Sequence, residues 1–366
     1  MRATFTALAT VLALTACGQN APAPAPSDTL AAKVEYSADA IKAETDRLNA
    51  WFEVKYEENL AFSPIQQTFL GRDTNQDKID DFSTEAQDTQ LAWRRHTMQD
   101  LLANFDYDKL TAEAKTSYDI WAYQSKAAEA ADKFRTNGYV FEQMGAIQSF
   151  FPQLLIAFQK VEDGKGMDNY LARIAGSARA LDQLVDRSKT NAKTGVHPPY
   201  FAFKQVIAES QKIITGAPFD NSGHDSAIWK DAKSKIAKLL KDKKIDQAKA
   251  DQLTSDIRTS LLENWKPAYE RLIAWQKQDQ VNATPEAHGV GSLPNGLAYY
   301  NERLANQTTT TLTADEIHQI GLSEVARLRG EMIAVKDKFG FEGSLPEFFK
   351  FLRETKDDER LYSVFW

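Results

Sequence analysis

Apolar side chains recur at steps of three and four residues through most of the chain, the spacing that puts them on one face of a helix. The clearest stripe lies within residues 169–187, where the apolar positions are Leu171, Ile174, Ala178, Leu181 and Val185. A second stripe lies earlier in the chain and consists of Ile41, Leu48, Trp51 and Phe52. Both stretches predict amphipathic helices that bury one face.

Residues that begin, bend and end helices support the same prediction. Ser63 followed by Pro64 predicts a helix N-terminus, because serine caps free backbone N–H groups and proline fits the first helical position. Gly71 is expected to end that short segment. Residues 255–278 predict a longer helix, and Pro267 predicts a bend in it, since proline lacks the N–H that the helix needs.

Strand patterns, by contrast, are nearly absent. The one short candidate, GYVFEQMG (138–145), is too weak to support a sheet. Loops rich in Gly, Pro, Asn or Asp are expected at 71–83, 136–145, 191–199, 216–223 and 282–298. We therefore predict an all-α domain of long packed helices over residues 36–358, with little or no sheet and with 282–298 as its best internal boundary.

The stretch TLTADEIHQIGLSEV (312–326) places an acid and a histidine close together on a predicted helix. Thr313 and Glu316 have the spacing of a capping box, in which the threonine caps the helix and the glutamate returns to the N–H of the cap. Glu316 and His318 point about 200° apart, so they cannot share a metal ion. We expect a helix start rather than a zinc site, with a buried stripe formed by Ile317, Ile320, Val325, Leu328 and Met332.

The first 16 residues have the pattern of a secretory signal peptide. Arg2 precedes an apolar run from Phe5 to Leu14, which is too short to span a bilayer as a mature helix. The run is followed by Leu-Thr-Ala and then Cys17, which resembles a bacterial lipoprotein signal. An ordinary cleavage site beside a chance cysteine is the alternative.

The resemblance implies that the thiol of Cys17 is lipidated and becomes the mature N-terminus. Residues 17–35 are rich in alanine and proline, a composition typical of an extended, flexible tether. Gly18 directly after the cysteine implies the outer membrane. We therefore expect an exported protein that a lipid anchor attaches to the periplasmic face of the outer membrane.

Composition narrows the classes of partner. The formal net charge is −7, which argues against nucleic acid as a partner. The most lysine-rich stretch, residues 230–249, spreads its lysines over several helix faces among aspartates and predicts a solvated surface. Because Cys17 is the only cysteine, disulfides and cysteine-based metal or nucleophile sites are excluded.

Three other motif-like features lack the required spacing. DTNQDKID (73–80) alternates acidic oxygens as a calcium loop does, but Lys78 and Thr84 stand where Gly and Glu are needed. GVGSLPNG (289–296) lacks the third glycine and the preceding strand of a nucleotide-binding turn. No histidine lies in the His-Glu-x-x-His or His-x-x-x-His spacing by which a helix binds zinc; the five are His96, His197, His224, His288 and His318. We expect no catalytic or metal-binding residue here.

Three blocks resemble, in the same order, the bacterial family catalogued as domain of unknown function 885. The most specific is LPNGLAYYNERLANQTTTTLTADEIHQIGLSEVARLRGEM (293–332). The other two are GRDTNQDKIDDFSTEA (71–86) and TGVHPPYFAFKQVI (194–207), and the resemblance extends over about residues 38–355. It implies the mainly helical N-terminal part of a zinc-metallopeptidase-like fold.

Members of that family resemble zinc metallopeptidases. Their zinc motif is a His-Glu pair followed by a Pro-Gly-His-His-type sequence, and a later Glu-Gly-Trp-Ala-type segment supplies a further ligand. Neither motif occurs in this sequence, and in the family both lie C-terminal to the block at 293–332. A catalytic zinc needs three protein ligands and a carboxylate for the bound water. We therefore expect no peptidase activity from this chain alone, whereas zinc is expected in a full-length member.

The C-terminal residues 359–366 are an atypical apolar tail, which we interpret as truncation or frameshift, with a genuine short variant as the alternative. Three hypotheses stay open: the N-terminal half of a lipid-anchored metallopeptidase-like protein, a non-enzymatic envelope lipoprotein that binds a peptide or partner protein, and a product that does not fold stably. Tyr299 and Tyr300 are candidates for a substrate cleft, with core packing as the alternative. The expected partners are the membrane, through the lipid anchor, and peptides.

Overall fold

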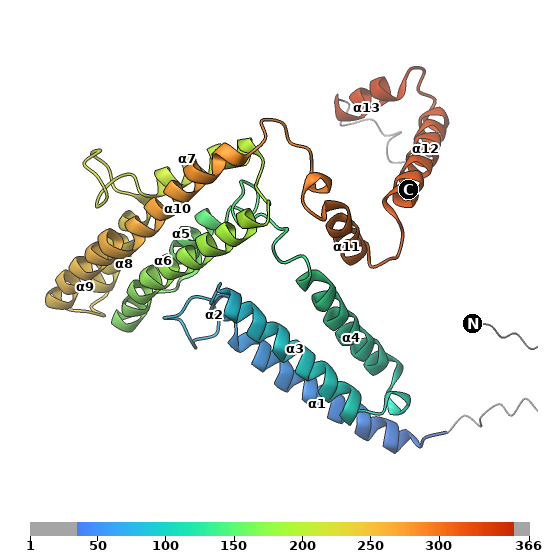
Figure 1. Ribbon diagram of the computed structural model, residues 1–366, viewed down its shortest axis with the longest axis horizontal. Helices are drawn as coiled ribbons and strands as arrows, with labels where there is room; N and C mark the ends of the chain where they lie inside the picture. Colours follow the sequence, from blue (N-terminus) through green and yellow to red (C-terminus); the bar gives the residue numbers. More distant parts are fainter. Residues whose placement is uncertain (1–34, 355–366) are drawn as a thin grey trace, which may run out of the picture.

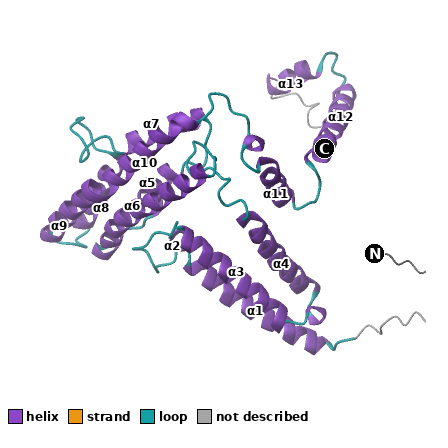
Figure 2. Cartoon of the chain, viewed as in Figure 1, coloured by secondary structure: helices purple, strands orange, loops and turns teal. Residues whose placement is uncertain are grey.

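The computed structural model describes residues 35–354, and this part of the chain consists of helices joined by loops and turns (Figure 2). No strand occurs within it, and the short candidate at 138–145 is a series of bends and turns. The prediction of an all-α fold is confirmed. The signal peptide, Cys17, the tether and the tail at 359–366 lie outside the described residues.

The first unit is built from the α-helices α1 to α4 (Figure 1). They are α1 (Ala38–Ala61), α2 (Pro64–Phe69), α3 (Thr84–Asn104) and α4 (Ala112–Asp132). Leu48 of α1 and Leu101 of α3 are fully buried in its core. Trp51 packs edge-on against Trp121 with ring centroids 5.2 Å apart, so the predicted stripe on α1 does meet the neighbouring helices.

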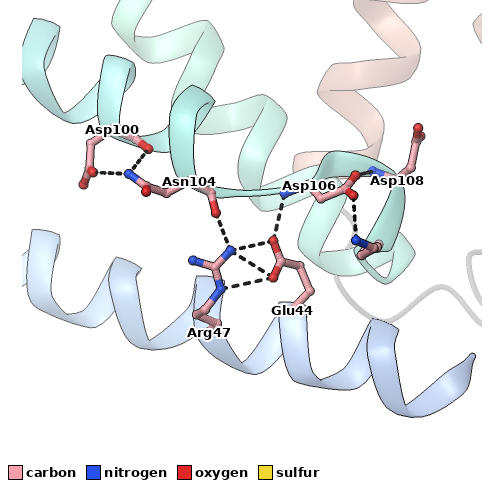
Figure 3. Close-up of polar contacts among 7 residues, drawn as sticks. Glu44, Arg47, Asp100, Asn104, Asp106 and Asp108 are labelled. Atoms are coloured by element: carbon pink, nitrogen blue, oxygen red, sulfur yellow. Dashed lines mark hydrogen bonds and ion pairs between the residues drawn. The ribbon is translucent and has the colours of Figure 1, made fainter. Parts of the chain in front are cut away.

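A polar network joins one end of α1 to the end of α3 (Figure 3). Arg47 binds Glu44 at 2.8 Å and donates to the main-chain carbonyl of Asn104, in the last turn of α3. Glu44 also accepts the backbone N–H of Asp106 at 2.8 Å. The hydrogen bonds from Arg47 and then from Asp106 lower the pKa of Glu44. These charges satisfy one another and the end of the helix, which gives the network a structural role.

The second, larger unit is formed by helices α5 to α10. Their bounds are α5 (Ile147–Gln153), α6 (Gly164–Lys193), α7 (Tyr200–Ile213), α8 (Ala227–Lys241), α9 (Gln247–Ser260) and α10 (Lys266–Asp279). The long helix α6 packs against both α10 and α9. Its predicted stripe is confirmed, because Ile174 and Leu181 are fully buried.

A π-helical turn precedes Pro267, the position at which a bend is predicted. Residues Leu261–Trp265 form a π-helical turn between α9 and α10, directly before this proline. A π-turn widens the helix locally, which accommodates a residue that cannot donate a backbone hydrogen bond. A second π-helical turn, Leu154–Phe158, follows α5, which contains Pro152.

The last three described helices differ in their surroundings: the first of them packs on the first unit, and the other two lie apart from both units (Figure 1). Helix α11 (Gly296–Thr308) packs beside α4, whereas α12 (Ala314–Phe339) and α13 (Leu345–Glu354) pack on each other. Phe339 at the end of α12 and Phe341 just after it meet two phenylalanines of α13, with ring centroids 5.3 to 5.6 Å apart; the two on α13 are Phe348 and Phe351. We call α12 and α13 the C-terminal arm.

Candidate functional site

Helix α12 begins as its sequence predicts. The backbone N–H of Thr313 donates to Oε2 of Glu316 at 2.7 Å, and the N–H of Glu316 donates to Oγ1 of Thr313 at 3.3 Å. The carboxylate of Glu316 also accepts the hydroxyl of Thr313 at 2.8 Å, and the bonds from the N–H and the hydroxyl of Thr313 lower the pKa of Glu316 by stabilising its ionised form. The predicted capping box is therefore confirmed. His318 lies on the same helix and is exposed.

The apolar stripe of α12 is exposed, however, and the prediction that it is buried is wrong. Ile320 is 49% exposed, Val325 65%, Leu328 42% and Met332 45%, and only Ile317 is partly covered. The apolar spacing identified the helix but could not show whether another element covers it. Nothing within residues 35–354 covers this face.

The exposed residues form an apolar strip along the helix, which Glu324 interrupts between Ile320 and Leu328. Leu322 and Ile333 extend it on one side, at 52% and 39% exposure. On the polar side, Arg327 binds Glu324 at 2.7 Å and Glu331 at 2.6 Å, so the local charges pair with one another. Monomeric proteins rarely expose such a surface, and a polar rim beside it is typical of a protein interaction site. We call Ile320, Leu322, Val325, Leu328, Met332 and Ile333 the α12 apolar face.

A second candidate site lies where the loops after α4, α6 and α10 meet. Nδ1 of His197 lies 2.9 Å from Oδ1 of Asp279, whose side chain is only 2% exposed. Asn282 donates to the same Asp279 oxygen at 3.2 Å. Asn137 donates to the carbonyl of Pro294 at 2.8 Å and thereby joins the loop after α4 to the loop after α10. A cavity of about 250 Å³ lies at this junction.

The sequence predicted a loop around His197 but not this contact. The two partners are 82 residues apart, and no motif links them. The only available signal was the helical register of α10, which places Asp279 on the same side as the buried residues Leu272 and Gln276. An acid on an apolar face needs a partner, but the sequence does not show which residue provides it.

The two tyrosines proposed for a substrate cleft lie on α11. Tyr299 is partly buried, and its ring packs against Phe134 with centroids 5.9 Å apart. Tyr300 is 41% exposed. Neither is among the residues that line the cavity beside His197. Their assignment to a cleft stays a prediction.

The side chains of the described region do not fit a metal site. Residues 35–354 contain no group of three or more His, Cys, Asp or Glu side chains that could bind a metal ion. In the calcium-like loop, the guanidinium of Arg173 donates to the carbonyl oxygens of Lys78 at 2.9 Å and Asn75 at 3.4 Å. The loop therefore presents its oxygens to an arginine. Zinc, which the family resemblance implies for a full-length member, has no matching set of ligands in the part of the chain that is described.

Comparison with known proteins assigns the class. The family DUF885, which is described as bacterial proteins of unknown function, matches residues 64–364 of the sequence. The chain therefore belongs to this family. No curated protein matches the sequence. No helix of the described region is long and apolar enough to cross a membrane.

The fold is also found among solved structures. One of them is the crystal structure of the "putative lipoprotein" from Colwellia psychrerythraea, which is 17% identical in sequence. The match has a TM-score of 0.64 and covers 89% of this chain but only 56% of the other. The chain therefore spans little more than half the length of this relative.

Proposed function

We propose that this chain is a lipid-anchored protein of the cell envelope that binds a second polypeptide through the α12 apolar face and has no peptidase activity alone. In this proposal its fold corresponds to the N-terminal part of a zinc-metallopeptidase-like protein. The observation that carries it is the exposure of α12, where Val325 is 65% exposed. This helix lies in the block at 293–332, which is the most specific feature of the family resemblance.

The proposed partner is a polypeptide equivalent to the part of a longer family member that this chain does not match. The chain spans 56% of the Colwellia relative, so that protein has additional chain that could cover α12. Covering each half-exposed side chain of the α12 apolar face contributes about 1 kcal/mol, so six of them contribute roughly 6 kcal/mol before the costs of association. A contribution of this size supports a specific complex.

The proposed lack of peptidase activity rests on the whole sequence. None of the five histidines is followed by glutamate, so the His-Glu pair of the family's zinc motif is missing. A zinc peptidase needs that carboxylate to accept a proton from the attacking water. In this proposal a peptidase site would need residues from outside this sequence.

The test is site-specific cross-linking in intact bacteria. A photoreactive benzoylphenylalanine is placed at Val325, and a control at Lys212, an exposed position of α7. The proposal expects a product only from position 325, in which mass spectrometry identifies a polypeptide with the family's zinc motif. A cross-link to a second copy of this chain, to an unrelated protein, or to nothing would overturn it. An unrelated protein would favour the non-enzymatic lipoprotein hypothesis.

A further inference from the structure

Three cavities adjoin one another along the seam between α6 and α10. The first, of about 380 Å³, and the second, of about 400 Å³, share Lys189, Trp275 and Gln278. The second and the junction cavity of about 250 Å³ share His197 and Asn282. We call these three adjoining cavities together the α6–α10 groove.

The groove has the length of a short peptide. It extends from Arg271 in the first cavity to Asn282 in the second, a separation of 11 residues along α10 and the turn after it. A helical rise of 1.5 Å per residue makes this about 16 Å. An extended chain rises about 3.3 Å per residue, so the groove accommodates about five residues of extended polypeptide.

Its acidic side chains already have partners. The pairs are Arg271 with Asp182 at 2.7 Å, Lys189 with Asp186 at 3.1 Å, and His197 with Asp279 at 2.9 Å. Lys193 lines the second cavity and forms no ion pair with any residue in 35–354. Asp279 accepts from a neutral His197 and keeps its charge, so the carboxylates and the cations of the groove balance. Lys193 is nevertheless the lining cation that has no carboxylate beside it, and its ammonium is available to a carboxylate of a ligand.

Two side chains along the groove are held in fixed orientations. A carboxylate can only accept, so Nδ1 of His197 donates to Asp279, and in the neutral ring Nε2 is then an acceptor. No described residue bonds to Nε2, and the ring borders two cavities. Trp275 donates from Nε1 to Oγ of Ser188 at 2.9 Å, which fixes its ring as an apolar wall. The groove thus offers an acceptor, an aromatic surface and a cation.

We infer that the α6–α10 groove binds the C-terminal end of an extended polypeptide. The terminal carboxylate pairs with Lys193, a peptide N–H donates to Nε2 of His197, and an apolar side chain packs on Trp275. A small aromatic acid shares the carboxylate and the apolar group but lacks the extended backbone. The inference is independent of the α12 apolar face, which is a different surface.

The test is calorimetric titration of the mature chain without its lipid. The probes are acetyl-Ala-Ala-Phe-Ala with a free C-terminal carboxylate, the same peptide as its amide, and phenylacetate. We expect saturable binding of the free acid and at least tenfold weaker binding of the amide and of phenylacetate. Absence of saturable binding, equal affinity for acid and amide, or phenylacetate binding as tightly as the peptide would each overturn the inference.

A variant pair locates the site. Lys193→Gln is expected to weaken binding of the free acid about tenfold and to abolish the difference between acid and amide. Lys212→Gln, on the exposed surface of α7, is expected to leave both affinities unchanged. Lys193 is itself exposed, so thermal melting should show that both variants keep the wild-type stability. If Lys193→Gln binds the free acid as the wild type does, the carboxylate site is assigned wrongly.

Discussion

Arg173 of α6 donates from Nε to the main-chain carbonyl of Lys78 at 2.9 Å, across 95 residues of sequence. The same guanidinium donates to Oγ1 of Thr68 at 2.6 Å and also binds the side chain of Gln159. The side chain is fully buried, and this burial lowers its pKa to about 10. One arginine therefore attaches α2 and the loop at 71–83 to the central helix of the larger unit.

Arg173→Met should lower the free energy of unfolding by about 3 kcal/mol, because it leaves several buried acceptors without a donor. Urea denaturation followed by circular dichroism measures the loss. Arg179→Met is the matched control: Arg179 is exposed on the same helix and donates to Ile79 at 3.3 Å, so its loss should cost less than about 1 kcal/mol. Equal midpoints for the two variants would show that the buried arginine does not hold the loop.

Asp80 should give stability an unusual dependence on pH. Its carboxylate accepts the N–H of Ile65 at 2.9 Å and the hydroxyl of Ser63 at 2.7 Å, but burial outweighs these bonds and raises its pKa. The folded state therefore binds the proton more tightly than the unfolded state does. This contribution to stability is complete below the ordinary pKa of about 3.9 and is lost as pH rises through the raised value.

Asp80→Asn is neutral at every pH and should lack this loss. Its free energy of unfolding, relative to that of the wild type, should therefore rise between pH 4 and pH 7. The neighbouring Asp81 provides the control, because hydrogen bonds from Ser83 lower its pKa and its contribution is lost as pH falls. Asp81→Asn should thus show a flat profile between pH 4 and pH 7 and the opposite trend below about pH 4, where the wild type loses the contribution of Asp81. Parallel pH profiles for the two variants would contradict the burial argument.

Local sequence signals predicted the helices of this fold well. The stripe on α6, the cap at Ser63 and the capping box at Thr313 depend on residues within one or two turns, and the structure confirms each. The long-range contacts were not predictable in this way. Arg173 to Lys78 and His197 to Asp279 join segments 95 and 82 residues apart, and no local period encodes such a pairing.

The stripe on α12 shows the limit of periodicity most clearly. It has the same three- and four-residue spacing as the stripe on α6, yet Leu328 is 42% exposed whereas Leu181 is fully buried. Spacing reports which residues share a face of a helix. Whether that face is covered depends on the tertiary arrangement, and for α12 we propose that the cover is another polypeptide.

The two leucines therefore make a direct test of burial. Leu181→Ala should destabilise the chain by about 2 to 5 kcal/mol, because it opens a cavity in the core. Leu328→Ala should change stability by less than about 0.5 kcal/mol, because its surroundings are solvent. Thermal unfolding of both variants measures the difference. A large loss from Leu328→Ala would mean that α12 is covered in the isolated chain and would remove the basis of the proposed interaction.

The purified mature chain should neither retain zinc nor cleave peptides. After incubation with excess zinc and dialysis, elemental analysis should find much less than one zinc ion per chain, since residues 35–354 lack a matching ligand group. A library of quenched fluorescent peptides should show no hydrolysis above buffer. Stoichiometric zinc together with hydrolysis would contradict both the sequence argument and the proposed function.

Cys17 should determine where the protein resides. If its thiol carries the lipid, the wild-type chain should incorporate labelled fatty acid and sediment with the outer membrane, because acyl chains at the mature N-terminus anchor a protein in the bilayer. Cys17→Ser removes the thiol and should abolish both the label and the membrane association. Pro22→Ala, in the tether, should change neither. A Cys17→Ser variant that still sediments with the membrane would mean that a surface of the folded part binds it, and the α12 apolar face would then be the first surface to mutate.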